Sequence, residues 1–216
     1  MTTRYDPAGI ESEFEPGSGG RVLRNLLGIK RVRDINLAES QALGLAQARA
    51  VETISESHCF NAADIRRLHR LWLEPLYAWA GEYRNVNMGK GGFQFAASAQ
   101  IPRLMQQFER EVLARHTPCK AGSNEEIAAA LAHVHAELIL IHPFREGNGR
   151  MARLLAMLMA LQAGLPPLDF SPLEGRGKRA YIAAIHAALG RNYQPLERLF
   201  LRIIERTWKT ASSSSR

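Results

Sequence analysis

The chain has 216 residues, of which 46% are hydrophobic and 23% charged, and this balance is typical of a globular protein with one sizeable core. It has no apolar run near the roughly 20 residues of a membrane span and no apolar signal core at its N-terminus, so we expect a cytoplasmic protein. The net charge of +7 comes from basic residues scattered through amphipathic segments, so direct nucleic-acid binding is not expected.

The predicted elements are mostly helices. Residues 1–20 are rich in Gly, Pro, Ser and acidic residues and indicate a flexible arm, and residues 21–33 indicate a short helix or turn packed on the body. Helical spacing of apolar residues predicts helices over residues 35–56, 62–79, 100–115, 124–141, 151–163, 174–189 and 195–209. The Ser-rich residues 210–216 indicate a disordered tail. We therefore expect an all-α fold with one domain over residues 21–209.

Local signals mark where some of these elements begin and end. Asn61 is a plausible helix N-cap, and Ser123 with Glu126 forms a capping box. Pro75 is expected to kink the helix predicted over residues 62–79, and Pro143 should end the one over residues 124–141. Residues 83–95 break the helical pattern with apolar residues separated by glycines, which predicts a β-hairpin with a Gly-rich turn.

The stretch from His142 to Arg153 is a polar cluster between two predicted helices. Gly147 and Gly149 have no Cβ, so the backbone around Asn148 could approach a ligand closely. The free N–H groups at a helix start favour phosphate oxygens, and Arg150 and Arg153 lie three residues apart on one helical face. The pattern predicts a site for a polyphosphate.

Two further side chains in this stretch carry chemistry. His142 has an ordinary pKa near neutrality and could take a proton from an attacking hydroxyl. Glu146 offers a hard oxygen ligand that could hold Mg²⁺ on a nucleotide. Together with the arginines, these residues indicate phosphoryl or nucleotidyl transfer, in which positioning and charge stabilisation dominate.

The stretch resembles the active-site motif of the Fic family, His-x-Phe-x-(Asp/Glu)-Gly-Asn-(Gly/Lys)-Arg-x-x-Arg, at every defined position. Residues 80–93 resemble the hairpin flap of that family, residues 23–29 its N-terminal segment, and residues 169–170 and 181–184 its later helices. The likeness spans about residues 10 to 205, so it implies a single Fic-type helical domain with one β-hairpin flap.

The resemblance implies a protein adenylyltransferase, which moves AMP from ATP to a Tyr, Thr or Ser hydroxyl of a target protein and releases pyrophosphate. His142 would activate the hydroxyl, and Glu146 would hold Mg²⁺ on the α- and β-phosphates. The implied nucleotide-binding residues are Gly147, Asn148 and Gly149 as an anion hole, Arg150 on the phosphates and Arg153 on the γ-phosphate. In the Doc-type branch, which phosphorylates its targets, Lys stands at the position of Gly149, so Gly149 favours nucleotidyl transfer.

The flap implied by the resemblance would pair its main chain with an extended segment of the target. The residues assigned to this docking flap are Met88, Gly89, Lys90, Gly91, Gly92 and Phe93.

The resemblance also bears on regulation. Many Fic proteins are inhibited by a helix carrying (Ser/Thr)-x-x-x-Glu-(Gly/Asn), whose glutamate pairs with the second motif arginine. No Ser or Thr in the 216 residues has Glu four positions later, and the closest pattern, at residues 171–175, is one residue short. Either a small separate antitoxin carries the inhibitory motif, as in the class I branch of toxin–antitoxin pairs, or a diverged segment does. Targets in that branch include type II topoisomerase subunits.

Other readings of the residues stay open. The motif does not show the base, so UTP or GTP could be the donor, or phosphate could be transferred. His133, His135 and His142 lie close in sequence, which is compatible with a metal-dependent hydrolase. A non-catalytic helical binding protein is the third alternative.

Overall fold

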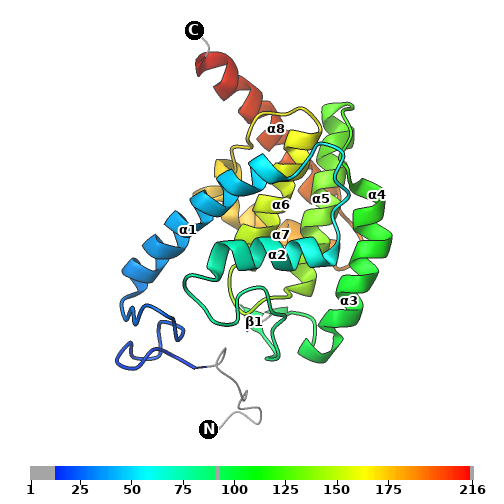
Figure 1. Ribbon diagram of the computed structural model, residues 1–216. Helices are drawn as coiled ribbons and strands as arrows, with labels where there is room; N and C mark the ends of the chain where they lie inside the picture. Colours follow the sequence, from blue (N-terminus) through cyan, green and yellow to red (C-terminus); the bar gives the residue numbers. More distant parts are fainter. Residues whose placement is uncertain (1–12, 91–92, 215–216) are drawn as a thin grey trace.

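The computed structural model describes residues 13–90 and 93–214. Helices surround a central pair, α5 and α6, with α1 and α2 along one side and α8 projecting beyond the body at its C-terminal end (Figure 1). The bounds of the longer helices are α1 Val32–Thr53, α2 Ala62–Leu73, α5 Asn124–Ile141, α6 Asn148–Gln162, α7 Lys178–Ala188 and α8 Gln194–Ser214. The predicted all-α fold is confirmed.

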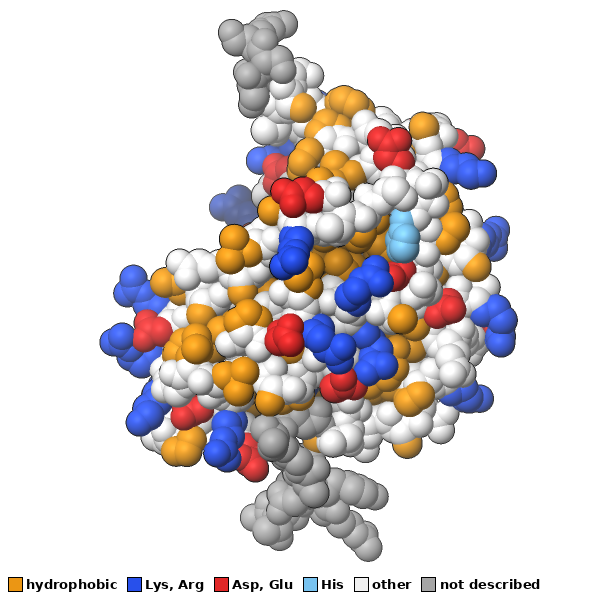
Figure 2. Space-filling view, viewed as in Figure 1, with side chains coloured by type: hydrophobic (Ala, Val, Ile, Leu, Met, Phe, Trp, Pro, Cys, Tyr) orange, Lys and Arg blue, Asp and Glu red, His pale blue; other side chains and the backbone are white. Residues whose placement is uncertain are grey.

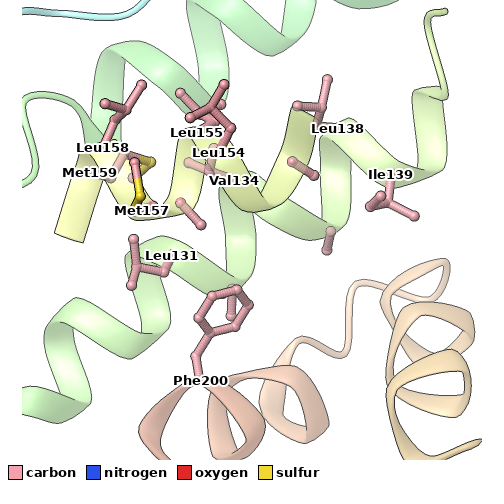
Figure 3. Packing of buried hydrophobic residues seen from close by; sticks show 14 of the residues in the cluster. Leu131, Val134, Leu138, Ile139, Leu154, Leu155, Met157, Leu158, Met159 and Phe200 are labelled. Atoms are coloured by element: carbon pink, nitrogen blue, oxygen red, sulfur yellow. The ribbon is translucent and has the colours of Figure 1, made fainter. Parts of the chain in front are cut away.

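The central helices form the core. The α5 helix begins at the predicted capping box, in which the Ser123 hydroxyl accepts from the Glu126 amide and the Glu126 carboxylate accepts from the Ser123 amide. Its apolar side chains interlock with those of α6 and α8 (Figure 3). The labelled residues are Leu131, Val134, Leu138 and Ile139 from α5, Leu154, Leu155, Met157, Leu158 and Met159 from α6, and Phe200 from α8. This rigid pair leads directly into the polar loop between residues 141 and 148.

The α2 helix starts at Asn61 as predicted but is shorter than expected. Its capping box joins the Asn61 side chain to the Asp64 amide, and the helix ends at Leu73. Pro75 follows two residues later, and turns then continue the chain, with the amides of Leu76 and Tyr77 bonded to the Leu73 carbonyl. The proline therefore ends the helix where we expected a kink.

The segment predicted as one helix over residues 100–115 is built from several pieces. They are the 3₁₀ turn η2 (Ser98–Gln100), α3 (Ile101–Phe108), the π-helical turn η3 (Glu109–Leu113) and α4 (Ala114–His116). The helix predicted from residue 174 begins at Lys178, after the 3₁₀ turns η4 (Ser171–Leu173) and η5 (Gly175–Gly177).

Both ends of the described chain are more ordered than predicted. Residues 13–20 do not form a free arm, because Phe14 bridges to Leu23 and the Glu15 amide donates to the Val22 carbonyl. At the other end α8 continues through residues 210–214, where a disordered tail was predicted. The hydroxyls of Thr210 and Ser212 there bond to carbonyls one turn earlier, which is compatible with a helix. The remainder of the predicted arm and tail lies outside the described residues.

The predicted hairpin consists of β1 (Gly89–Lys90) and β2 (Phe93–Gln94), paired antiparallel with Gly89 opposite Gln94 and Lys90 opposite Phe93. It lies at the same end of the molecule as the loop between α5 and α6 (Figure 1). Gly91 and Gly92 lie outside the described residues.

On the face drawn in Figure 2, basic side chains are interspersed with acidic and apolar ones and form no continuous basic surface. Within the described ranges, none of the helices is both long and apolar enough to cross a bilayer.

Candidate active site

The loop begins where α5 ends, at His142. This residue has φ 53° and ψ 59°, a left-handed conformation that is uncommon outside glycine. Three backbone groups are held there. The His142 amide donates to Leu138, its carbonyl accepts from Arg84 Nε at 2.7 Å, and the Pro143 carbonyl accepts from the Arg84 amide at 2.9 Å. These bonds fix the direction in which the imidazole leaves the backbone.

The imidazole of His142 is half-buried and has a defined tautomer. Nδ1 lies 3.2 Å from the Ile139 carbonyl, and because a carbonyl only accepts, Nδ1 carries the proton. Nε2 is then left with a lone pair. The ring also stacks on Phe95 with centroids 3.6 Å apart. Burial is the main cause that lowers the pKa of His142, to about 4, so the neutral form dominates near pH 7.

Asn148 closes the loop on itself. Its side-chain oxygen accepts from the Phe144 amide at 2.9 Å, and its side-chain nitrogen donates to the Phe144 carbonyl at 2.7 Å. Asn148 is 3% exposed, so this paired contact is shielded from water. The Asn148 side chain therefore stabilises the loop, and the part that Asn148 plays in an anion hole stays a prediction.

The structure requires glycine at position 147 but not at position 149. Gly147 has φ +82°, and an added Cβ would lie 2.5 Å from Cζ3 of Trp72, so both conformation and packing require glycine. Gly149 lies in α6 without a positive φ, and a Cβ there would meet nothing within 4 Å. We expected unusual backbone freedom at both positions, and it is found at Gly147 alone. The protein itself leaves open space beside Gly149.

A buried histidine on α2 also supports the loop. His69 on α2 accepts from the Gly81 amide at Nδ1 (2.8 Å), so its Nε2 donates to the Glu146 carbonyl (3.1 Å). Its ring stacks on Phe144 with centroids 3.8 Å apart. Burial lowers the pKa of His69 to about 4, which keeps it neutral and preserves this donor–acceptor arrangement.

The two motif arginines on α6 have different surroundings. Arg150 donates through Nη2 to Glu39 of α1 (2.7 Å) and lies 3.4 Å from Glu146, and its guanidinium lies over the Trp72 ring at 4.7 Å. Arg153, by contrast, has no hydrogen bond or ion pair within residues 13–90 and 93–214. The Arg153 guanidinium interacts electrostatically with His135 and Tyr181, whose side chains hydrogen-bond to each other at 2.9 Å.

Glu146 contacts its neighbours through one carboxylate oxygen. Its Oε1 accepts from the Gly147 amide at 2.8 Å and from Arg150, whereas Oε2 has no hydrogen bond within the described part of the chain. The side chain is 44% exposed, so Oε2 is accessible to a ligand from solution.

Arg84 links the loop to the hairpin. Arg84 is 2% exposed, and its guanidinium donates to carbonyls of both segments. On the loop side it bonds His142 and Ile141, and on the hairpin side it bonds Val86 and Ala96. These acceptors lie before β1 and after β2, so one side chain fixes both ends of the hairpin relative to His142.

Aromatic contacts complete the hairpin's attachment. Phe95 stacks on His142, and Phe93 stacks on His186 of α7 with centroids 5.1 Å apart. The structure thus brings Phe93 and its flank close to the loop, while Met88, Gly89 and Lys90 lie on the opposing strand and its approach.

The histidine cluster proposed for a metal-dependent hydrolase does not form. His133 bonds His116 at 3.0 Å and His135 bonds Tyr181, so neither joins His142. In the described residues, no three His, Cys, Asp or Glu side chains gather in a way that could hold a metal.

Sequence reasoning missed four residues that shape this site: Glu39, His69, Trp72 and Arg84. Each acts through contacts with residues far away in the chain, and only Arg84 lies in a segment that the resemblance had singled out. A polar residue at a core-facing helical position, as at Glu39 and His69, was the available signal.

Comparison with known proteins agrees with this geometry. The family model described as Fic/DOC matches residues 59–160, which include α2, the hairpin and the whole loop. A probable protein adenylyltransferase, y4lH of Sinorhizobium fredii, is 33% identical over 156 residues, covering 72% of this chain and 79% of that protein. The chain belongs to the Fic/DOC family.

Longer relatives and solved structures support the same assignment. VbhT, a protein adenylyltransferase of Bartonella schoenbuchensis, is 31% identical over 69% of this chain, but the alignment spans only 30% of VbhT. The structure of BepC from Bartonella tribocorum with bound AMPPNP superposes with a TM-score of 0.70 at 26% identity, over 84% of this chain and 91% of BepC. The Fic domain of a Bartonella quintana protein with bound ADP superposes with a TM-score of 0.69 at 26% identity, over 88% of this chain and 92% of that chain.

Proposed function

We propose that this protein, a protein adenylyltransferase by family, uses His142 as the base that transfers AMP from ATP to a side-chain hydroxyl of a target protein. The observation that carries the proposal is the state of His142, which is neutral, has Nδ1 bonded to a carbonyl and keeps the Nε2 lone pair for a proton. The relatives y4lH and VbhT are named as protein adenylyltransferases, the first as a probable one. Two related Fic structures contain bound AMPPNP or ADP.

In the proposed reaction the hydroxyl oxygen of the target attacks the α-phosphorus of ATP. The proton of that hydroxyl passes to Nε2 of His142, the bond between the α-phosphorus and the bridging oxygen breaks, and pyrophosphate leaves. His142 has a low pKa in the ligand-free protein, and the negative phosphates of bound ATP would raise this pKa and so make His142 a better base.

The phosphates would be held by the start of α6 and its arginines. The dipole and free amides at the start of α6 favour negative charge, and the open space beside Gly149 lets phosphate oxygens approach them. Arg150 would contact the phosphates and Arg153 the γ-phosphate, since Arg153 has no competing partner in the described residues. The absence of a side chain at Gly149 supports nucleotidyl transfer.

Glu146 fits the role of a Mg²⁺ ligand shared with the nucleotide. Within the described residues, Oε2 of Glu146 has no hydrogen bond, and the side chain is accessible. A magnesium ion on a nucleotide needs only one or two protein carboxylates. When bound, Mg²⁺ would neutralise charge on the phosphates. The residues themselves position the nucleotide, and His142 moves the proton.

The hairpin would dock the target. Its two short strands present an edge beside the loop, and Phe95 of its flank contacts the His142 ring directly. An extended target segment paired with this edge would bring a hydroxyl close to Nε2 without a demand for one sequence.

We propose that a separate small antitoxin inhibits this protein. We place both proteins in the cytoplasm. The support is that no (Ser/Thr)-x-x-x-Glu pattern occurs in the 216 residues and that Arg153 has no partner within the described residues. A glutamate supplied by another protein could then pair with Arg153. A tyrosine of a type II topoisomerase subunit is the target that this branch suggests.

The test is transfer of label from ATP to protein in the presence of Mg²⁺. ATP labelled at the α-phosphate should mark a target protein in a lysate, or this protein itself, and intact-mass measurement should show the gain of one AMP. Label that arrives only from the γ-phosphate would overturn AMP transfer in favour of phosphorylation, and parallel reactions with UTP and GTP test the donor base.

Two variants separate chemistry from binding. His142→Ala should abolish labelling but leave binding of AMPPNP unchanged, because the imidazole acts only on the hydroxyl. Arg153→Ala should weaken AMPPNP binding about tenfold, the effect of losing one charge-assisted contact. Equal AMPPNP affinity of wild type and Arg153→Ala in isothermal titration would refute the role of Arg153.

A further inference from the structure

One carboxylate of α1 is buried against the candidate active site, although α1 is otherwise distant from the motif in sequence. Glu39 is 4% exposed, and both of its carboxylate oxygens are engaged. Oε2 accepts from Arg150 Nη2 at 2.7 Å, and Oε1 accepts from the Tyr77 hydroxyl at 2.6 Å. The Glu39 carbonyl accepts from the indole N–H of Trp72 at 2.8 Å.

These contacts make Glu39 a common anchor for the walls of the site. Trp72 is the ring on which the guanidinium of Arg150 lies, and it is also the ring that contacts Gly147. The backbone of Glu39 thus holds the surface beneath Arg150, and its side chain holds the guanidinium itself. Arg150 is fixed from two directions by a residue 111 positions away in the chain.

Energetics argue that this pair does more than attach α1 to the body. Burying a carboxylate costs free energy, and a buried ion pair seldom stabilises a protein more than well-packed apolar residues would. Buried ion pairs are better understood where they fix one geometry. Here the geometry that is fixed belongs to an arginine of the proposed nucleotide site.

The contacts leave most of the guanidinium free for a ligand. Arg150 uses only Nη2 toward Glu39 and Glu146, so Nε and both N–H groups of Nη1 have no hydrogen-bond partner in the described residues. An arginine already held in this way loses less side-chain freedom when it binds a phosphate than a mobile one does. Glu39 therefore need not be displaced when the nucleotide arrives.

We propose that Glu39 is a positioning residue for nucleotide binding, which acts by holding the Arg150 guanidinium on Trp72 with its free donors available to ATP phosphates. The proposal rests on the proposed function, since it assigns Arg150 to the phosphates. It predicts that loss of the Glu39 charge weakens ATP binding, although Glu39 never touches ATP.

The experiment compares Glu39→Gln with wild type in two assays. Isothermal titration with AMPPNP and Mg²⁺ should show a Kd about tenfold higher, the loss expected for one charge-assisted contact. In AMP transfer, KM for ATP should rise by a similar factor while kcat changes less than about threefold, because Arg150 would hold the phosphates equally in the ground and transition states.

Two further single variants supply a matched control and a milder test. Glu52→Gln removes a glutamate from the exposed end of the same helix and should leave AMPPNP affinity and AMP transfer unchanged. Tyr77→Phe removes one hydrogen bond from Glu39 but keeps its ion pair with Arg150, so the Kd should rise only about threefold. Thermal melting confirms that each variant folds, and Tyr77→Phe keeps the test available if Glu39→Gln does not.

A double variant distinguishes positioning from a general structural role. If Glu39 acts through Arg150, then Glu39→Gln combined with Arg150→Ala should bind AMPPNP no more weakly than Arg150→Ala alone. Losses that add would overturn the proposal, because they would show that Glu39 affects binding by another route.

Two other results would also overturn it. Unchanged affinity in Glu39→Gln would mean that the pair only attaches α1, and tighter binding or faster transfer would mean that Glu39 holds Arg150 back. These results differ from a failure of the proposed function, because AMPPNP binding is measured independently of transfer. Wild-type protein that binds AMPPNP but transfers no AMP would refute the function and still leave the Glu39 comparison decisive.

Discussion

The loop over residues 142–150 and the hairpin over residues 88–95 approach the same histidine but are built in opposite ways. The loop is closed by the buried Asn148 side chain and supported by His69 and Trp72. The hairpin has only two residues in each strand, and Gly89 and Lys90 are exposed. Its attachment relies on Arg84 and on two aromatic stacks.

The two regions suit two different roles in the proposed reaction. Catalytic groups must be held close to their working geometry before the substrate arrives, and the many bonds in the loop achieve this. A surface that pairs with the main chain of a target needs an accessible edge and tolerates side-chain variation. The predictions below test whether the loop is as intolerant, and the hairpin as tolerant, as this comparison suggests.

Among the variants that test this comparison, Gly147→Ala should have the largest effect. The new methyl group would lie 2.5 Å from Trp72 at a residue with φ +82°, so the loop must move. We expect AMP transfer to fall about 100-fold, since small misplacements of catalytic groups have effects of that order. The free energy of unfolding should fall by about 1–3 kcal/mol. Initial rates and urea denaturation measure the two effects.

The matched control is Gly149→Ala, in the same turn. Its methyl group would meet nothing in the protein, so the free energy of unfolding should stay at or slightly above that of wild type. If Gly147→Ala folds and transfers AMP like wild type, the loop is not the rigid half of the site.

The next effect tests Arg84, whose side chain bonds both the loop and the hairpin. Arg84→Gln removes a buried guanidinium that bonds carbonyls of the loop and of both hairpin ends, so transfer should fall about tenfold while AMPPNP affinity stays within about twofold. Arg84→Lys keeps the charge but reaches fewer carbonyls, so its transfer rate should lie between those of Arg84→Gln and wild type. Wild-type kcat in Arg84→Gln would show that hairpin and loop are positioned independently.

The rigid half of the site was also the part most visible in the sequence. The motif from His142 to Arg153 is local, so twelve consecutive positions suffice to predict a loop between two helices. Capping boxes at Asn61 and Ser123 are local as well, and both helices start where they indicated. Local chemistry decides these features almost alone.

The sequence could not predict what holds the motif in place. The position of Glu39 in its helix indicates at most that it faces the core, and its partner Arg150 lies 111 positions away, so the contact is found only once α1 packs on α6. The side-chain bonds of Asn148 were not predicted either. The resemblance places the residue in an anion hole and says nothing of its side chain, which bonds the backbone of Phe144. The roles of the motif residues in catalysis stay predictions.

Two buried histidines provide a pH test of the rigid part of the site. Burial lowers the pKa of His135 to about 3 and that of His142 to about 4. The unfolded chain protonates each of these near pH 6.5, so the stability linked to neutral His135 and His142 is complete above that pH. It is lost as the pH falls from 6.5 toward 3, by up to about 1.4 kcal/mol per pH unit for each histidine.

Urea denaturation at a series of pH values measures this dependence. His135→Asn should reduce the slope between pH 6 and 4 by about one proton. An identical slope in His135→Asn and wild type would mean that His135 gains a proton in the folded protein as easily as in the unfolded one.

The smallest effect is expected from Lys90→Ala in the hairpin. The Lys90 side chain is exposed, and if target docking uses the main chain, its removal leaves the docking edge in place. We expect kcat/KM for the target to change less than about threefold and KM for ATP to stay constant, measured by AMP transfer at varied target concentration. A loss above about thirtyfold would show that a side chain reads the target there, since it exceeds what one exposed charge contributes. The hairpin would then be as specific in its own way as the loop, and variation in its sequence would alter the choice of target.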